Sequence, residues 1–417
     1  MKTKKQMKRI SLFMVAILAA GSLTAQTLED YLQMAVENNP GIRARETEMQ
    51  AALQKLPQAK SLPDPTVNAS FFISPMMLPE GNQLGSISVM QMFPWPGTRA
   101  AMENEAARMA EVKQQDVQVA QNELALSVKN AWYPLLGLEA QIRIQKELLR
   151  VLEADKELAA FRFGQGQAPM VDVIRADMMI DEARTEIALL ELKRKPMEAV
   201  FNRLLNRDDS QPVVLSGVLP EPRPEMTGWQ DSLIAHNPAL AVFDKQIEAA
   251  AAGEAVAEAM QKPMFGVGIQ YMPFTRRKDY SVHELPPNTG QDMIMPMVSV
   301  TLPIWNKKYK AAVEERRLMQ GSYASMKQDM QNELAAMYAM TVYESEKMAQ
   351  MIALYNLQMI KTQQSIDLLL AAYSNSGQDF MEVLRMQQQL FRYRMEKVSA
   401  QTAYQLALAK MDYLTGK

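Results

Sequence analysis

Cysteine is absent from this 417-residue chain, and histidine occurs only twice, as His236 and His283. The lack of cysteine excludes disulfide bonds, thiolate metal sites, cysteine catalysis and lipidation of an N-terminal cysteine. Two histidines so far apart in the chain argue against a histidine-based zinc or iron site. Serine and the carboxylates form no catalytic pattern such as G-x-S-x-G. The sequence therefore predicts no enzyme, no cofactor and no metal site.

A strong charge of one sign is also missing, because the formal net charge is −2 at pH 7. Nucleic acid is not expected as a partner, since binding it needs a clear basic excess. After residue 26 no uninterrupted apolar stretch reaches roughly 18 residues, so a transmembrane helix is not expected. The chain is then either soluble or inserted in a membrane as β-strands.

The N-terminus carries the first specific signal. Basic residues at positions 2–9 precede an apolar run at 10–20, and mostly small residues follow at 21–25. This order is typical of a secretory signal peptide, here residues 1–25, with cleavage after 22 or 26 left open. An apolar run of about eleven residues is too short to span a bilayer as a helix, which needs roughly 20. The mature chain is expected to be exported.

The same order of features occurs twice, and an internal repeat decides the fold. We predict a first copy at 27–206, a linker at 207–226 that holds a short apolar run at 213–215, and a second copy at 227–416. Asn39-Pro40 recurs as Asn237-Pro238. An offset of 210 pairs several later positions, including Asp172 with Glu382. The run at 213–215 is compatible with a strand.

Each copy contains one very long helical stretch. The stretches begin near Arg99 and Lys308, and their apolar positions follow near-heptad spacing, which is typical of a coiled-coil seam. Globular helices average about 11–12 residues, so an ordinary core helix is a weaker interpretation. Pro134 and Gly137 lie within the first stretch, and we expect a kink near 130–137. Shorter helices before and after each stretch match its length when placed end to end.

Each copy also contains two short segments in which apolar and polar residues alternate, at about 66–93 and 265–304. Such segments suit transmembrane β-strands and soluble sheets equally well. The signal peptide favours the membrane, as do Trp95 and Trp305, which lie just past strand ends as interfacial aromatics do. Four strands cannot close a membrane barrel, which needs at least about eight. Other copies of the chain must complete it.

These residues resemble the TolC family of outer-membrane efflux proteins over about 27–416. The resemblance rests on the order and duplication of short motifs: Asn38-Asn39-Pro40, Leu62-Pro63-Asp64-Pro65, Phe93-Pro94-Trp95-Pro96-Gly97 and Ser299-Val300-Thr301-Leu302-Pro303. It implies a mainly α fold with a small β part: a two-repeat, long-helix α-barrel in the periplasm and a shared twelve-stranded β-barrel in the outer membrane. It also implies a homotrimer that works with a periplasmic adaptor and an inner-membrane pump.

In the family the two helix–helix turns, here 163–172 and 373–382, form the closed tunnel entrance and the surface that binds the adaptor. The residues carried over to these turns are Phe163, Gly164, Gly166, Asp172, Tyr373, Ser376, Gly377, Gln378 and Glu382. Ser376 replaces a usual glycine, and Gln378 replaces an arginine found in some members, so a lock built on that arginine would be altered. The glycines could simply end helices, and the two acids could cap the returning helices or ring the entrance.

The leading interpretation is a passive outer-membrane conduit of a tripartite efflux or type I secretion system. One alternative is the outer-membrane component of a copper- or silver-type metal efflux system. The chain has 34 methionines, including Met76-Met77, Met178-Met179 and Met293, Met295 and Met297, and thioethers bind such metals. Flexible apolar packing explains the methionines more simply. A soluble periplasmic adaptor is a weaker alternative. No pattern in the sequence identifies the exported substrate or the pump.

Overall fold

The computed structural model describes residues 27–215, 217–222, 234–276, 288–376 and 380–416. The predicted signal peptide at 1–25 and the first residues of the second copy, 227–233, lie outside them. Contacts divide the chain into two compact units. The first unit comprises 1–43, 120–237 and 333–417, and the second comprises 44–119 and 238–332. The two units are described separately below.

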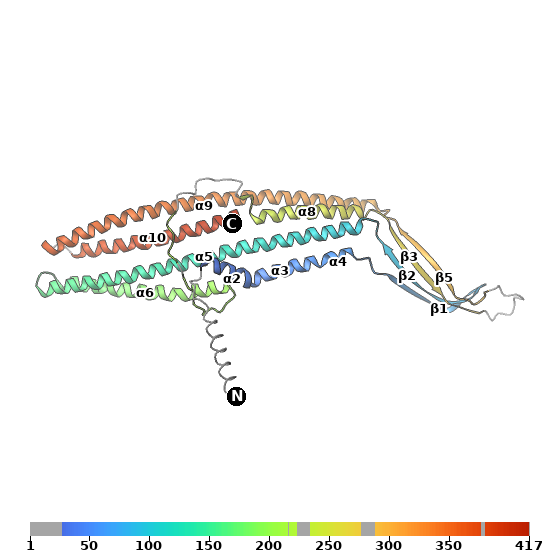
Figure 1. Ribbon diagram of the computed structural model, residues 1–417, viewed down its shortest axis with the longest axis horizontal. Coiled ribbons are helices and arrows are strands. Elements are labelled where there is room, and N and C mark those ends of the chain that lie inside the picture. Colours follow the sequence, from blue (N-terminus) through green and yellow to red (C-terminus); the bar gives the residue numbers. More distant parts are fainter. Residues whose placement is uncertain (1–26, 216, 223–233, 277–287, 377–379, 417) are drawn as a thin grey trace, which may run out of the picture. The chain divides into compact units, whose positions relative to one another are not determined.

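The first unit is built from helices that Figure 1 labels along the chain. Its helices, some of which also extend into the second unit, are α2 (Leu28–Asn38), α3 (Pro40–Leu53), α5 (Thr98–Gly164), α6 (Met170–Leu204), α9 (Asn306–Ser376) and α10 (Phe380–Thr415). α5 and α9 contain 67 and 71 residues, or roughly 100 Å each at 1.5 Å per residue. Pro134 lies inside α5, whose helical assignment is unbroken around it. The kink expected there stays a prediction.

Three aromatic rings form the centre of the main core of the first unit. Tyr31 and Phe201 are fully buried, and their ring centroids lie 5.1 Å apart, with Trp132 at 5.2 Å from Tyr31 and 5.7 Å from Phe201. Tilted and edge-on pairs of this kind add about 0.5–1.5 kcal/mol each to the burial of their area. The core therefore joins α2, α5 and α6.

The apolar run at 213–215 packs onto this core and is not a strand. Val213 is buried, and the backbone N–H of Val214 donates to Tyr31 Oη over 3.1 Å. Tyr31 Oη in turn donates to the Val214 carbonyl oxygen over 3.4 Å. Because the tyrosine hydroxyl satisfies both backbone groups of Val214, this residue needs no partner strand.

One asparagine contact occurs in both copies. Asn39 donates through Nδ2 to the carbonyl oxygen of Leu204, at the end of α6, over 3.0 Å. Asn237 donates in the same way to the carbonyl oxygen of Leu414, near the end of α10, over 3.1 Å. Carbonyls in the last turn of a helix lack partners within the helix, so each asparagine supplies one. Both contacts join the beginning of a copy to its end.

Asn39 also begins the next helix. Its Oδ1 accepts a hydrogen bond from the backbone N–H of Gly41 over 2.8 Å, and Pro40 occupies the first helical position of α3. Asparagine is a preferred residue for such a cap, and proline is favoured at the first position because its missing N–H would have no partner there. The Asn-Pro motif thus starts one helix and holds the end of another.

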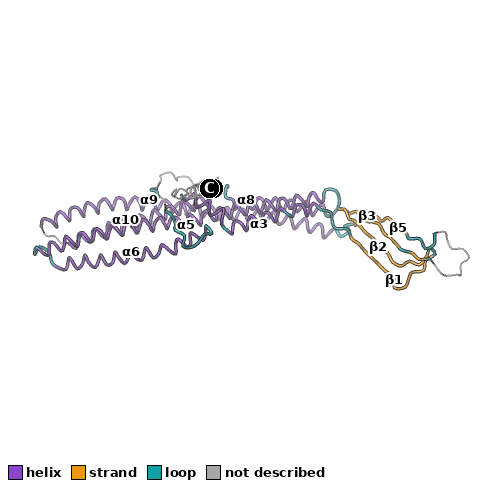
Figure 2. The backbone as a smooth tube through the Cα atoms, turned by 60° about the horizontal axis from the view of Figure 1, so that its bottom comes forward, coloured by secondary structure: helices purple, strands orange, loops and turns teal. Residues whose placement is uncertain are grey.

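The second unit carries the sheet, shown in Figure 2. Its own elements are α4 (Lys55–Lys60), β1 (Thr66–Leu78), β2 (Gly81–Phe93), α8 (Pro238–Ala259), β3 (Met264–Met272), β4 (Phe274–Thr275) and β5 (Met293–Thr301). The long strands pair antiparallel in the order β1-β2-β3-β5. The sequence did not predict β4, a two-residue strand that pairs with the start of β2.

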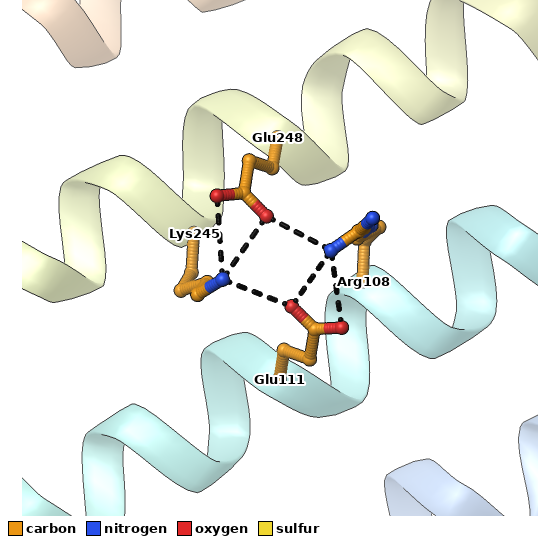
Figure 3. A network of polar contacts seen from close by, with 4 residues as sticks. All are labelled: Arg108, Glu111, Lys245 and Glu248. Carbon is orange, nitrogen blue, oxygen red and sulfur yellow. Dashed lines mark hydrogen bonds and ion pairs between the residues drawn. The ribbon is translucent and has the colours of Figure 1, made fainter.

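Four charged side chains link α5 to α8 in the second unit (Figure 3). Arg108 Nη1 lies 3.0 Å from carboxylate oxygens of both Glu111 and Glu248, and Lys245 Nζ lies 3.1 Å from both carboxylates. The pKa of Glu111 is lowered below its ordinary value, mainly by the hydrogen bond from Lys245. Burial opposes this effect, and the hydrogen bond from Arg108 adds to it. Each charge in the ring thus has two neighbours of opposite sign.

We predict that Asn39→Ala lowers the stability of the purified protein by about 2 kcal/mol or more. The estimate combines the loss of a helix cap, about 1 kcal/mol, with a carbonyl left without its partner, about 1–3 kcal/mol. Asn39→Asp keeps the acceptor that caps α3 but loses the donor to Leu204, so its effect should be smaller than that of alanine. Thermal unfolding followed by circular dichroism checks the order. Asn130→Ala, at an exposed position of α5, is the matched control, and equal melting temperatures for all four proteins would contradict the prediction.

Candidate functional site: the turns that end the long helices

The first turn is a compact helix termination. The N–H of Gly166 donates to the Phe163 carbonyl oxygen, and the N–H of Gln167 donates to the Arg162 carbonyl oxygen, both over 2.9 Å. These two bonds, with Gly166 at φ +71°, form a Schellman motif. Gly166 therefore occupies a left-handed position that favours glycine. A Cβ atom at Gly164 would meet nothing within 4 Å, so the space there does not require glycine.

The second turn lies partly outside the described residues. α9 ends at Ser376 and α10 begins at Phe380, whereas Gly377 and Gln378 fall in the gap between them. Nothing is described of the Ser376 side chain. The substitutions at 376 and 378 therefore stay as predictions of an altered lock.

A shared core holds the two turns together within the first unit. Its buried members come from α5, α6, α9 and α10: Leu152, Ala159, Val173, Ala176, Ile180, Ala183, Tyr373, Phe380, Val383 and Leu384. Tyr373 and Phe380 stack with centroids 5.1 Å apart, across the gap that separates α9 from α10. Packing of one ring on the other brings the end of α9 next to the start of α10.

Arg162, which the sequence analysis did not select, joins the two copies at this core. Its guanidinium carbon lies 4.1 Å from the centroid of the Tyr373 ring, and Nη1 donates to the Tyr373 carbonyl oxygen. The Tyr373 hydroxyl is buried and has no hydrogen-bond partner among the described residues. The pKa of Tyr373 is raised, chiefly by burial. The charge of Asp172 adds to this effect, and the nearby charge of Arg162 opposes it.

The two acids of the turns have different surroundings. Asp172 lies in the first turn of α6, is only 6% exposed, and has an oxygen 3.8 Å from Arg175 Nη1. Glu382 lies in the first turn of α10 and is half-buried, with an oxygen 2.5 Å from Arg385. Both acids sit where a helix N-terminus favours negative charge. Of the two acids, Glu382 is the more accessible, with a side chain 40% exposed against 8% for Asp172.

The aromatic residues that begin the turns differ in the same way. Phe163 is 45% exposed, whereas Tyr373, its partner at the offset of 210, is 3% exposed. Further exposed apolar side chains surround Phe163 on both sides of the first turn: Phe161, Met170, Val171 and Ile174. Large exposed apolar clusters mark surfaces that bind other proteins. The first turn is thus flanked by exposed apolar side chains, whereas Tyr373, which precedes the second turn, is buried.

A buried carboxyl lies inside the helices, two turns of α5 before its end. Asp155 is 7% exposed and contacts Gln387 of α10, and one oxygen of each side chain has no hydrogen-bond partner among the described residues. Burial raises the pKa of Asp155 to about 6, and the hydrogen bond from Gln387 offsets part of this effect. Along α5, Asp155 follows Leu152 by three residues and precedes Ala159 by four. A carboxylate at this apolar seam position is a sequence signal that was missed.

The two tryptophans occupy equivalent bends at the ends of β2 and β5. Trp95 is half-buried, with its ring 5.6 Å from that of Phe265 on β3, whereas Trp305 is 76% exposed. In each case the tryptophan carbonyl oxygen accepts a hydrogen bond from the backbone N–H three residues later, at Thr98 and at Lys308. The same backbone turn therefore supports one packed ring and one free ring.

Metal clusters and membrane-spanning helices are absent from the described ranges. No three His, Asp or Glu side chains there come together as a group that could hold a metal ion. No helix in those ranges is both long enough and apolar enough to pass through a membrane. The described site therefore consists of the two turns and the core between them.

Two helical repeats, each with a strand hairpin and a turn at the end of its long helix, define a subunit of an outer-membrane export duct. A family model described as outer membrane efflux protein matches residues 31–207 and 229–417, and the chain belongs to this family. No curated protein matches the chain. The protein is therefore placed in the outer membrane, with helices that extend into the periplasm.

Solved structures share the fold. A membrane protein from Pseudomonas aeruginosa is 16% identical, with a TM-score of 0.71, and the match covers 93% of this chain and 92% of that one. The outer membrane protein VceC from Vibrio cholerae is 16% identical, with a TM-score of 0.69 and coverages of 93% and 96%. The MtrE outer membrane channel from Neisseria gonorrhoeae is 15% identical, with a TM-score of 0.71 and coverages of 93% and 88%.

Family membership confirms the predicted resemblance and fold class. Members of the family are trimeric channels of tripartite efflux systems, which work with adaptor and pump partners and are not enzymes. The interpretation of this chain as a soluble periplasmic adaptor is set aside.

We predict that Asp155→Asn stabilises the protein at pH 8 but not near pH 4. Because the folded-state pKa of about 6 exceeds the ordinary value of 3.8, the folded state holds an extra proton between these values. Stability is then greatest below about pH 4 and falls as pH rises to about 6, by on the order of 3 kcal/mol. Asparagine removes this dependence. Melting temperatures at both pH values test it, with Asp181→Asn on exposed α6 surface as control, and parallel profiles for wild type and Asp155→Asn would contradict it.

Proposed function

We propose that three copies of this chain form a passive conduit that carries small molecules from an inner-membrane pump across the outer membrane. The pump supplies the energy, and a periplasmic adaptor joins it to the turns described above. The observation that carries this proposal is the sheet, because its four long strands leave two edges open in one chain.

The open edges require other copies of the chain. Among the described residues, β1 pairs only with β2, and β5 pairs only with β3 along its length. One face of the sheet is apolar and exposed, with Val67 at 62%, Val267 at 58% and Val298 at 78%. Unpaired backbone groups cost several kcal/mol each in hydrocarbon, so an open edge cannot persist there. Three chains joined edge to edge would give a closed sheet of twelve strands.

Trp95 and Trp305 support the same placement. Both stand at the end of the sheet where the long helices begin, and indole rings favour the boundary between lipid and water. The exposed ring of Trp305 would face the lipid headgroups directly. We assign both residues to the membrane interface on the periplasmic side.

The turns support the entrance and the adaptor site. Exposed Phe163, with the apolar residues around it, offers a surface that an adaptor would cover. Three half-exposed copies of Glu382 would surround the entrance with negative charge and favour cations. Asp172 is buried and would act on the entrance through the helix that it begins, with no contact with the exported molecule.

Arg162 is proposed to close the entrance in this chain. The resemblance predicts a lock with an arginine at position 378, where this sequence has glutamine. Arg162 instead supplies a guanidinium to Tyr373, from α5 to α9 of the same chain. Opening of the turns would break this contact, because α5 and α9 lead to different turns.

We predict that Arg162→Ala raises the conductance of the purified trimer in planar bilayers several-fold. A stacked arginine contributes about 0.5 kcal/mol on an exposed ring and about 2 kcal/mol on a desolvated one such as Tyr373, or a two- to thirty-fold shift of a closed–open equilibrium. Arg162→Lys should fall between, because an ammonium lacks the planar face that stacks on Tyr373. Arg184→Ala on α6, whose ion partner Glu153 lies away from the turns, is the control for loss of a positive charge.

The same preparation tests the conduit itself. The proposal expects a mass of three chains in light scattering and a stepwise conductance in the wild type. A monomer, or a trimer that never conducts even with Arg162 replaced, would overturn the proposed conduit.

We predict that Phe163→Asp abolishes export while leaving the trimer in the outer membrane. The change places a charge in the apolar surface proposed for the adaptor, where its desolvation is unfavourable. Gln165→Glu adds a charge to the same turn without removing an apolar side chain, so it should retain most activity. Export from cells that lack their own copy of the chain, together with the amount of trimer in outer-membrane fractions, gives the readout. Normal export by Phe163→Asp would place the adaptor elsewhere.

A further inference from the structure

On strands β2, β3 and β5, every methionine lies on the same face of the sheet. Strand register places cross-strand partners on the same side, and alternate residues follow along each strand. We define the methionine face by the members that share one side of β2, β3 and β5: Met90, Met92, Met264, Met272, Met293, Met295 and Met297. The opposite side of these three strands carries no methionine.

The placement of these methionines on one side of the strands is not explained by apolar packing alone. The side without methionine is the apolar one, with Val89, Val267, Ile269, Val298 and Val300. The methionine face shares its side with Leu84 and with polar and small residues: Asn82, Ser86, Ser88, Gly266, Gly268, Gln270, Ser299 and Thr301. On β2, β3 and β5, methionine that served only as a flexible apolar filler would be expected on the apolar side as well, where Met76 of the neighbouring strand β1 does lie.

Two of the sulfur atoms converge on one hydroxyl. Ser299 Oγ of β5 lies 3.8 Å from Met90 Sδ and 3.6 Å from Met92 Sδ, although both methionines belong to β2. The side chains reach across β3, which lies between these strands in the sheet. They cover a distance of two strand spacings, roughly 10 Å.

Glycine makes this reach possible. A Cβ atom at Gly266 would lie 2.6 Å from Met92 Sδ and 3.1 Å from Met90 Sδ, so a side chain there would collide with both sulfurs. The two sulfurs therefore lie no more than about 6 Å apart, the sum of these distances. A Cβ at Gly268 would likewise lie 3.0 Å from Met90 Sδ. Two glycines thus keep a gap over β3 that the thioethers occupy.

A third thioether borders the same gap. Met297 is the β5 partner of Gly268, as Met90 is its β2 partner, so both flank a residue without a side chain. Met297 and Ser299 lie two residues apart on one strand and share a side. Met297 is half-buried and has three rotatable bonds with which to approach the other sulfurs.

We propose that Met90, Met92 and Met297 form a binding site for a soft monovalent metal ion, copper(I) or silver(I), over Gly266 and Gly268. Thioether sulfur is the soft ligand that selects such ions, and no carboxylate of these strands shares this side to attract harder ions. Small rotamer changes bring sulfurs within about 6 Å to a shared ion, since a metal–sulfur bond is about 2.3 Å. Met293, Met295 and Met272 continue the methionine face beyond the site. The site requires only the sheet of one chain and stands independently of the proposed conduit.

The test uses the purified full-length protein in detergent and silver nitrate as the probe, in buffer without chloride. Calorimetric titration gives the affinity, and elemental analysis after desalting gives silver bound per chain. The variant M90L/M92L/M297L replaces sulfur with carbon at nearly constant volume, a change that cores tolerate. The matched control M109L/M178L/M340L removes three exposed helical methionines.

The wild type and the control are expected to bind at least one more silver ion per chain than M90L/M92L/M297L, or to bind it at least tenfold more tightly. Equal binding by all three proteins would overturn the site. Should the variant fail to fold, X-ray absorption of the wild type loaded with copper(I) still decides. A first shell that contains two or three sulfurs supports the proposal, and a shell of only nitrogen and oxygen overturns it. Failure here leaves conductance and trimer mass unaffected, so it is distinguishable from failure of the conduit.

Discussion

The contact between an asparagine amide and the end of a distant helix is the interaction on which each copy depends. Asn39 and Leu204 lie 165 positions apart, and Asn237 and Leu414 lie 177 apart. A helix end leaves carbonyls without partners, and the first turn of the next helix leaves N–H groups without partners. One asparagine side chain has both a donor and an acceptor, so Asn39 satisfies one group of each kind. This explains why an asparagine, followed by proline, stands at the same place in both copies.

The duplicated backbone is used unequally at the turns. Phe163 is exposed among apolar neighbours, whereas Tyr373 is buried beneath Arg162. Because Arg162 belongs to the first copy and Tyr373 to the second, the contact joins the two copies at the place where they would have to separate. In the proposed conduit, one repeat would therefore provide a surface for a partner while the other is held at Tyr373. A perfectly symmetrical pair of turns could not divide these roles.

The sheet faces two different environments for a related reason. On β2, β3 and β5 the branched apolar residues and the methionines occupy opposite sides, so strand alternation separates a lipid-suited surface from a sulfur-bearing one. Glycine on β3 then decides what the sulfurs can do, since any side chain at 266 would push them apart. The chemistry of this face depends on a residue that contributes no functional group.

The sequence by itself determined the class of fold, because heptad spacing, strand alternation and the repeat are local patterns that survive in any packing. It also located Gly166, Asp172 and Tyr373 at the turns, through motifs whose order is preserved in the family. It did not reveal Arg162 over Tyr373, Asp155 against Gln387, Val213 against Tyr31, or the two sulfurs at Ser299. Each of these contacts joins residues from about 180 to more than 230 positions apart, and sequence periodicity shows which face a residue occupies but not which distant side chain meets it. Only the tertiary structure, by packing the second copy and the linker against the first copy, decided those partners.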